Sequence, residues 1–147
     1  MSHLLEPLLT YAPYLALLAR VWFGATLMLH GRPKLNKERR AQSIANFKAK
    51  GVPPIAVDLG IIIEFFGGLL LVIGLIVPIV AAITAVYFLS IIQEKRTQDH
   101  AQYVAFGKAS YELEAFFVLI SIALVVLVRS KSASELRSSA VWHRPLE

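Results

Sequence analysis

Apolar residues fill four long segments of the chain, and polar residues are concentrated between them. The segments cover residues 8–29, 55–77, 79–93 and 110–128. A helix of about 20 residues, rising ~1.5 Å per residue, crosses the ~30 Å hydrocarbon core of a bilayer. In lipid each segment must be helical, because the bilayer offers no hydrogen-bond partner to an open backbone. The pattern therefore predicts an all-α integral membrane protein, an antiparallel bundle of four transmembrane helices.

The four spans form one membrane domain, residues 1–129, and a polar basic tail follows over residues 130–147. Pro78 separates the second and third spans with almost no loop, which predicts a tight hairpin. The third span is short for a membrane crossing, and we expect it to borrow residues from the turn or to lie where the membrane is thin.

The loop between the first two spans contains a further helical candidate over residues 37–50, KERRAQSIANFKAK. Ile44 and Phe47 are spaced i, i+3 among basic residues, as on an amphipathic helix that lies in the membrane interface. A solvated basic loop fits the same residues.

Composition supports the membrane assignment and excludes several chemistries. The chain has 147 residues, of which 56% are hydrophobic, too many for a soluble domain of this size. It contains no cysteine, so disulfides, thiolate catalysis and cysteine-ligated metal centres are excluded within it. The net charge of +5 comes mainly from loops beside the spans, which indicates membrane topology and no nucleic-acid partner.

Basic residues also predict the orientation in a plasma or inner membrane. Two loops that share one side carry Arg32, Lys34, Lys37, Arg39, Arg40, Lys48, Lys50, Lys95, Arg96 and Lys108. The other side carries Arg129, Lys131, Arg137 and Arg144. Ten basic residues against four place both loops in the cytoplasm and both termini outside.

Two charged residues lie inside apolar spans, where an unpaired charge is costly. Arg20 lies ten residues before His30, where the first span reaches the loop, and Glu64 lies nine residues after Ile55, where the second span leaves it. Both are then roughly 14–15 Å below the same face. We therefore expect a buried Arg20–Glu64 ion pair, either as a structural clamp or as part of a functional site.

Other polar residues gather toward the same face and predict a cavity that opens between the two basic loops. The candidate lining residues are His30, Lys34, Tyr87, Ser90, Glu94, Tyr111 and Glu112. The opposite leaflet is filled by apolar residues, so a through-channel is not indicated. Glycines predict close helix packing, either plain packing or, less often, a gap for a ligand, at Gly24, Gly60, Gly67, Gly68 and Gly74.

The polar set favours binding over a defined catalytic chemistry. No two histidines stand at ligand spacing on one helix, so no metal site is predicted, and no catalytic residue can be assigned. An apolar slot with a few donors and a proton-exchanging carboxylate suits a quinone or another flat amphipathic molecule. Lipid headgroups or a small anion fit the same set, and no covalent cofactor is expected.

Three motifs in the first half of the chain resemble the DoxX family of small four-helix membrane proteins. They cover residues 20–35 (RVWFGATLMLHGRPKL), 47–53 (FKAKGVP) and 59–75 (LGIIIEFFGGLLLVIGL). The resemblance weakens in the second half, where residues 129–136 replace the glycine-rich ending common in the family.

This resemblance implies a redox-linked membrane subunit, of the thiosulfate:quinone oxidoreductase or quinol oxidase type. The leading hypothesis is accordingly a subunit that interacts with quinone or quinol and works with a redox partner protein. The alternative is a non-catalytic module, either a scaffold for a membrane complex, homo-oligomers included, or a small lipid or metabolite carrier. The thiosulfate-oxidising relatives would also favour a cavity that opens outward, against the orientation given by the basic loops.

Overall fold

The computed structural model describes the backbone of residues 2–105 and 108–142, and the side chains of residues 11–105 and 108–128. In these parts of the chain the elements are helices, and the only β-type pairing is an isolated bridge between Gln102 and Ser110. The elements in chain order are α1 (Ser2–Gly31), η1 (Arg32–Leu35), α2 (Lys37–Ala49), α3 (Ile55–Ile61), η2 (Ile62–Gly67), α4 (Gly68–Ile73), α5 (Val77–Gln98) and α6 (Glu112–Trp142).

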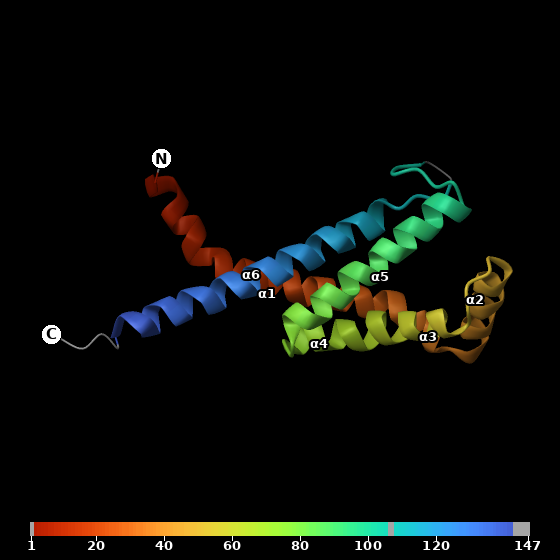
Figure 1. Ribbon diagram of the computed structural model, residues 1–147, viewed down its shortest axis with the longest axis horizontal. Helices are drawn as coiled ribbons and strands as arrows, with labels where there is room; N and C mark the ends of the chain where they lie inside the picture. Colours follow the sequence, from red (N-terminus) through yellow and green to blue (C-terminus); the bar gives the residue numbers. More distant parts are fainter. Residues whose placement is uncertain (1, 106–107, 143–147) are drawn as a thin grey trace.

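Three stretches are long and apolar enough to cross a membrane: Tyr11–Leu35, Ile55–Ile73 and Val77–Gln98. The second of them is a continuous rod made of α3, η2 and α4, in which η2 is π-helical and not α-helical. α6 is also long, 31 residues, and packs along α5 (Figure 1). The prediction of an all-helical membrane protein is therefore confirmed for the described residues, with three spans identified by length and composition.

The hairpin between α4 and α5 turns over three residues, Gly74–Ile76. Gly74 takes a left-handed conformation with φ +89°, and the N–H groups of Gly74 and Leu75 both donate to the carbonyl oxygen of Leu70. This pattern closes the C-terminus of a helix and favours glycine. Pro78 then falls in the first turn of α5, where its missing N–H costs no hydrogen bond.

Helix boundaries differ from the predicted spans, because of a glycine at one end and of charged residues at another. The second span ends at Ile73 and not at residue 77, because Gly74 ends the helix. The third helix runs from Val77 to Gln98, longer than the predicted 79–93. The apolar segment of the sequence ends before Glu94 and Lys95. Both side chains form ion pairs in the structure, and the backbone stays helical beyond them. The predicted loop helix is present as α2.

The helices pack through a small aromatic and aliphatic core. Phe23 of α1, Phe88 of α5 and Phe117 of α6 meet edge to face, with ring centroids 5.5 Å apart for Phe23–Phe117 and 4.8 Å for Phe88–Phe117. Leu27 and Leu71 are fully buried beside them. These contacts fix α1 and α5 against α6 at the middle of the bundle.

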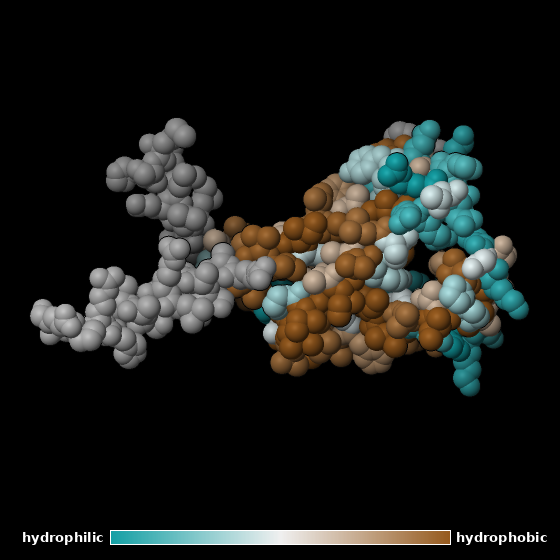
Figure 2. Space-filling model, viewed as in Figure 1, coloured by the Kyte–Doolittle hydropathy of each residue, from teal (hydrophilic) through white to brown (hydrophobic). Residues whose placement is uncertain are grey.

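Most large apolar side chains face outward, as expected for a protein whose solvent is lipid. Trp22, Val86 and Leu119 are among the exposed ones. Figure 2 shows hydrophobic residues covering the middle of the bundle, while hydrophilic residues gather at the end that carries α2 and the α5–α6 connection. The molecule thus has one strongly polar end and an apolar middle section.

Candidate functional site

Glu64 is the centre of a buried polar cluster. The Nζ atom of Lys34 lies 2.6 Å from each carboxylate oxygen of Glu64, and the hydroxyl of Tyr87 donates to Oε1 at 2.8 Å. Glu64 is only 3% exposed. A buried carboxylate is stable only when paired and hydrogen-bonded, and this one has both a cation and a neutral donor.

Three separate elements bring these groups together. Glu64 lies in the π-helical segment η2. π-helical turns are rare in proteins, and those that occur are often found at functional sites. Lys34 lies in the short 3-10 helix η1, which turns the chain back directly after α1. Tyr87 lies on α5. The cluster therefore ties the first loop to the second and third spans.

Two glycines make room for this arrangement. A Cβ on Gly31 would lie 2.8 Å from the backbone nitrogen of Phe65, so the end of α1 can approach η2 only because Gly31 has none. A Cβ on Gly60 would lie 2.6 Å from the Tyr87 hydroxyl oxygen. Sequence analysis included Gly60 among the packing glycines but missed Gly31, although it stands next to His30 in the first family-like motif.

An apolar groove of about 500 Å³ runs along the outer face of the bundle and passes Tyr87. It lies between the second span and α5, and its lining residues are Ala56, Leu59, Ile63, Ala82, Ile83, Val86, Tyr87 and Ser90. Most of the wall is aliphatic, and the two hydroxyl-bearing residues come from consecutive turns of α5. A flat apolar molecule could lie in the groove with its polar end near Tyr87.

The prediction of an Arg20–Glu64 ion pair is wrong. Glu64 is occupied by Lys34 and Tyr87, and Arg20 lies at the α4–α5 hairpin, where a Cβ on Gly74 would be 2.8 Å from the guanidinium. Ten residues separate Glu64 from Gly74, which is roughly 15 Å along a helix.

The physical reason is the register of the antiparallel pair formed by α1 and the second span. The expectation placed the end of α1 level with Ile55, where the second span begins. In the structure Gly31 is level with Phe65, because η1 and α2 lie between the two helices at the loop end. Gly24 is then level with Gly68, and Arg20 with Gly74.

A family model for DoxX matches residues 15–93, which is more than half of the chain. The chain belongs to the DoxX family. The matched part contains Lys34, Glu64 and Tyr87 together with Arg20. No curated protein and no solved structure shows significant similarity to the chain.

Other residues expected at the cavity of this DoxX protein take different places. His30 is exposed, its Nδ1 lies 2.9 Å from the Thr26 carbonyl oxygen, and its ring packs against Phe117 at 5.5 Å. It does not reach the Glu64 cluster. Ser90 lines the groove but donates its hydroxyl to the backbone oxygen of Tyr87 at 2.6 Å.

Glu94 belongs to a second polar cluster at the loop end. Lys50 donates to Glu94 at 2.9 Å and to Asp99 at 2.8 Å, and these bonds to Asp99 and Glu94 raise the pKa of Lys50. Lys50 follows α2, so this cluster anchors the loop helix to α5.

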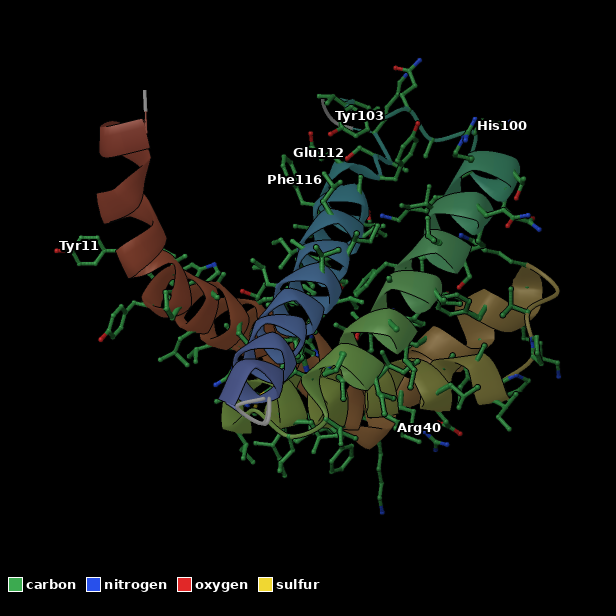
Figure 3. The ribbon with its side chains drawn as sticks, turned by 60° about the vertical axis from the view of Figure 1, so that its left-hand side comes forward. Tyr11, Arg40, His100, Tyr103, Glu112 and Phe116 are labelled. Atoms are coloured by element: carbon green, nitrogen blue, oxygen red, sulfur yellow. The ribbon has the colours of Figure 1, made fainter. Side chains whose placement is uncertain are left out.

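The start of α6 forms a third polar region. Tyr111 packs against Tyr103 with ring centroids 5.7 Å apart, and Figure 3 shows Tyr103, Glu112 and Phe116 close to one another there. Of the two acidic residues at the start of α6, Glu114 forms an ion pair, with Lys95 at 2.6 Å. The described partners of Glu64 are Lys34 and Tyr87, so neither Tyr111 nor Glu112 belongs to the Glu64 cluster.

On the opposite side of the molecule, Arg40 fixes α2 to the second span (Figure 3). Its guanidinium makes two parallel hydrogen bonds of 2.7 Å to the carboxylate of Asp58, and the bond to Asp58 raises the pKa of Arg40. Across the residues that the structure describes, no group of three or more His, Cys, Asp or Glu side chains could hold a metal ion.

Proposed function

We propose that this DoxX-family protein binds a quinone or quinol in the apolar groove between the second span and α5, as the membrane subunit of a redox complex. One observation carries the proposal: the groove is lined by Tyr87, whose hydroxyl donates to a buried carboxylate that is itself paired with Lys34. A quinone needs an apolar slot for its ring and tail and a proton-exchanging group beside its oxygens.

The cluster suits the proton chemistry of a quinone. Reduction of a quinone takes up two electrons and two protons, and oxidation of the quinol releases them. A quinol hydroxyl beside Tyr87 in the groove can donate to the Tyr87 oxygen, because the Tyr87 hydroxyl uses its own proton toward Glu64. As one quinol proton moves to Tyr87, the Tyr87 proton moves to Glu64. The second quinol proton is released to water, and both electrons pass to the redox partner protein.

Lys34 connects this step to the loop end of the molecule. Its side chain is 33% exposed, compared with 4% for that of Glu64. It stabilises the carboxylate that accepts the proton, and it is the member of the cluster that water can reach. The electrons are exchanged with a redox partner protein, which we propose as the second component of the complex.

We further propose that α6 is a fourth membrane span, which completes a four-helix bundle. Ala115–Val128 is free of charged residues, and α6 packs along α5. The basic loops then face the cytoplasm and both termini lie outside. A reporter that is active only in the cytoplasm, fused in turn to each terminus, tests this. Two silent fusions support the proposal, two active ones reverse the orientation, and activity at Glu147 alone means that α6 does not cross.

The binding proposal is tested with the full-length protein purified from membranes. We expect quinone in the extracted lipids and a rise in the melting temperature on addition of decylubiquinone. Tyr87→Phe and Glu64→Gln should reduce that rise, whereas Glu94→Gln, a carboxylate of the second cluster, should not. A protein without quinone and without a quinone-dependent shift would contradict the proposal.

A non-catalytic scaffold or carrier remains the second candidate, because the Lys34–Glu64 pair also ties the first loop to the second span. The discriminating variant replaces both residues, Lys34→Leu with Glu64→Leu. If it folds, assembles and still shows the quinone-dependent shift, the pair is only a clamp. If it folds but loses the shift, the pair belongs to the binding site.

A further inference from the structure

A second apolar groove continues the one that passes Tyr87. It has a volume of about 200 Å³ and also lies between the second span and the beginning of α5. Ile63 and Ile83 line both grooves, so the two form one continuous depression on the outer face of the bundle. The second part, here named the hairpin-side groove, is lined by residues between Ile62 and Leu70 and between Ile76 and Thr84.

The two grooves differ in the polar groups that they offer a ligand. Tyr87 and Ser90 bring hydroxyl oxygens to the first groove. Thr84 has the one hydroxyl in the lining of the hairpin-side groove, and it is fully buried and donates to the Val80 carbonyl oxygen at 2.8 Å. A quinol ring therefore finds hydrogen-bond acceptors beside Tyr87, whereas the hairpin-side groove suits hydrocarbon.

Gly67 keeps the hairpin-side groove open. Of the atoms packed against this position, only Val80 Cγ1 would lie within 4 Å of a Cβ, at 3.5 Å, which is an ordinary contact. The neighbouring Gly68 differs, because its Cβ position is blocked by the backbone of α1. The missing side chain at Gly67 is thus not required by a helix crossing, and it leaves space beside Val80 in which a ligand can lie.

The order of the two grooves agrees with the layers of the membrane. Glu64 lies at the middle of the second span, nine residues from each end of Ile55–Ile73. Gly60, against which Tyr87 packs, lies four residues or ~6 Å closer to the basic loops. Gly67 lies on the other side of Glu64. A ligand with its ring at Tyr87 and its tail in the hairpin-side groove therefore has its polar end on the loop side and its tail across the membrane centre.

We propose that the hairpin-side groove holds the isoprenoid tail of the quinone whose ring lies beside Tyr87. This inference rests on the proposed function and adds a selection by tail to it. Ile79 lies eight residues from Tyr87 along α5, roughly 12 Å, so a ligand must carry a long tail to fill both grooves. A lipid acyl chain would otherwise cover the groove. The tail thus gains only the difference in packing, and its effect on affinity is several-fold.

The test compares two quinones with the same ring, one without a tail and one with a polyisoprenoid tail. Their affinities for the full-length protein are measured from the change in melting temperature with quinone content, in nanodiscs of a single lipid composition. Gly67→Leu should fill the hairpin-side groove. It should weaken binding of the tailed quinone several-fold and leave binding of the tail-less quinone unchanged.

A second variant covers the case in which Gly67→Leu does not fold. Ile79 is 57% exposed at the rim of the groove, so Ile79→Trp can cover the groove without disturbing the core, and it should also weaken the tailed quinone. Ile73→Trp is the matched control, because Ile73 is 59% exposed and lines neither groove. It should bind both quinones as the unmodified protein does.

The outcomes separate this inference from the proposed function. If Ile79→Trp and a folded Gly67→Leu bind the tailed quinone normally while Tyr87→Phe weakens both quinones, the groove is covered by lipid. The inference is then overturned, and the proposed function stands. If neither quinone binds the unmodified protein, both are overturned.

Discussion

Gly24 and Gly68 face each other where α1 crosses α4, and neither position has room for a side chain. A Cβ on Gly24 would lie 2.6 Å from the carbonyl oxygen of Gly68, and a Cβ on Gly68 would lie 2.6 Å from that of Gly24. Because both obstacles are backbone atoms, the helices must separate to admit a methyl group. Small residues are the usual means by which membrane helices approach this closely.

Gly68→Ala should therefore destabilise the protein, by about 1–3 kcal/mol, through overpacking. Gly67→Ala is the matched control, because a Cβ there would lie 3.5 Å from Val80 Cγ1, an ordinary contact. Thermal unfolding of the two variants in the same detergent measures the difference. Equal melting temperatures would contradict the close crossing.

Removing Lys34 should cost more than removing an ordinary surface lysine. Lys34→Met leaves Glu64 buried with Tyr87 as its remaining partner, and breaking a buried pair costs about 3–5 kcal/mol. The partial exposure of Lys34 brings the expected loss below that range, to about 2–3 kcal/mol. Lys37→Met, on the exposed face of α2, serves as the control. A loss of the same size in both variants would show that Lys34 has no special role in stability.

Gly60 and Tyr87 should be energetically coupled. Gly60→Ala places a Cβ 2.6 Å from the Tyr87 hydroxyl oxygen and should push that hydroxyl away from Glu64. In a Tyr87→Phe background the same substitution should be less harmful by about 1 kcal/mol, since the hydroxyl is gone. A double-mutant cycle in thermal unfolding gives the coupling. A value near zero would place the Tyr87 ring elsewhere.

Gly74 and Gly51 both have positive φ, +89° and +75°, but different surroundings. Gly51→Ala should cost about 1 kcal/mol from the backbone alone, because nothing lies within 4 Å of its Cβ position. Gly74→Ala carries the same backbone cost and also displaces the Arg20 guanidinium, 2.8 Å away. Its loss of stability should be larger, and Arg20→Ala should remove the excess. If Gly51→Ala and Gly74→Ala unfold at the same temperature, Arg20 does not pack on Gly74.

The identity of the polar residues could be predicted from sequence, but their pairing could not. Glu64, Lys34 and Tyr87 all stood out as polar groups in or beside apolar spans. The sequence pointed to Arg20 as the partner of Glu64, because counting residues from the loop treats both helices as starting at one level. η1 and α2 occupy the loop end, and this shifts α1 so that Gly31 meets Phe65. The π-helical turn around Glu64 has no signal in the sequence pattern.

The sequence by itself determined the helical class, the membrane as solvent, and the positions of the hairpin and the loop helix. Hydropathy, helix-stopping glycine and proline, and charge placement are local properties, and they act wherever the chain lies. Only the tertiary structure decided that Lys34 reaches Glu64, that Arg20 lies by the hairpin, and that a groove leads to Tyr87. These depend on the register between helices, and register is set by glycine contacts between residues distant in the chain.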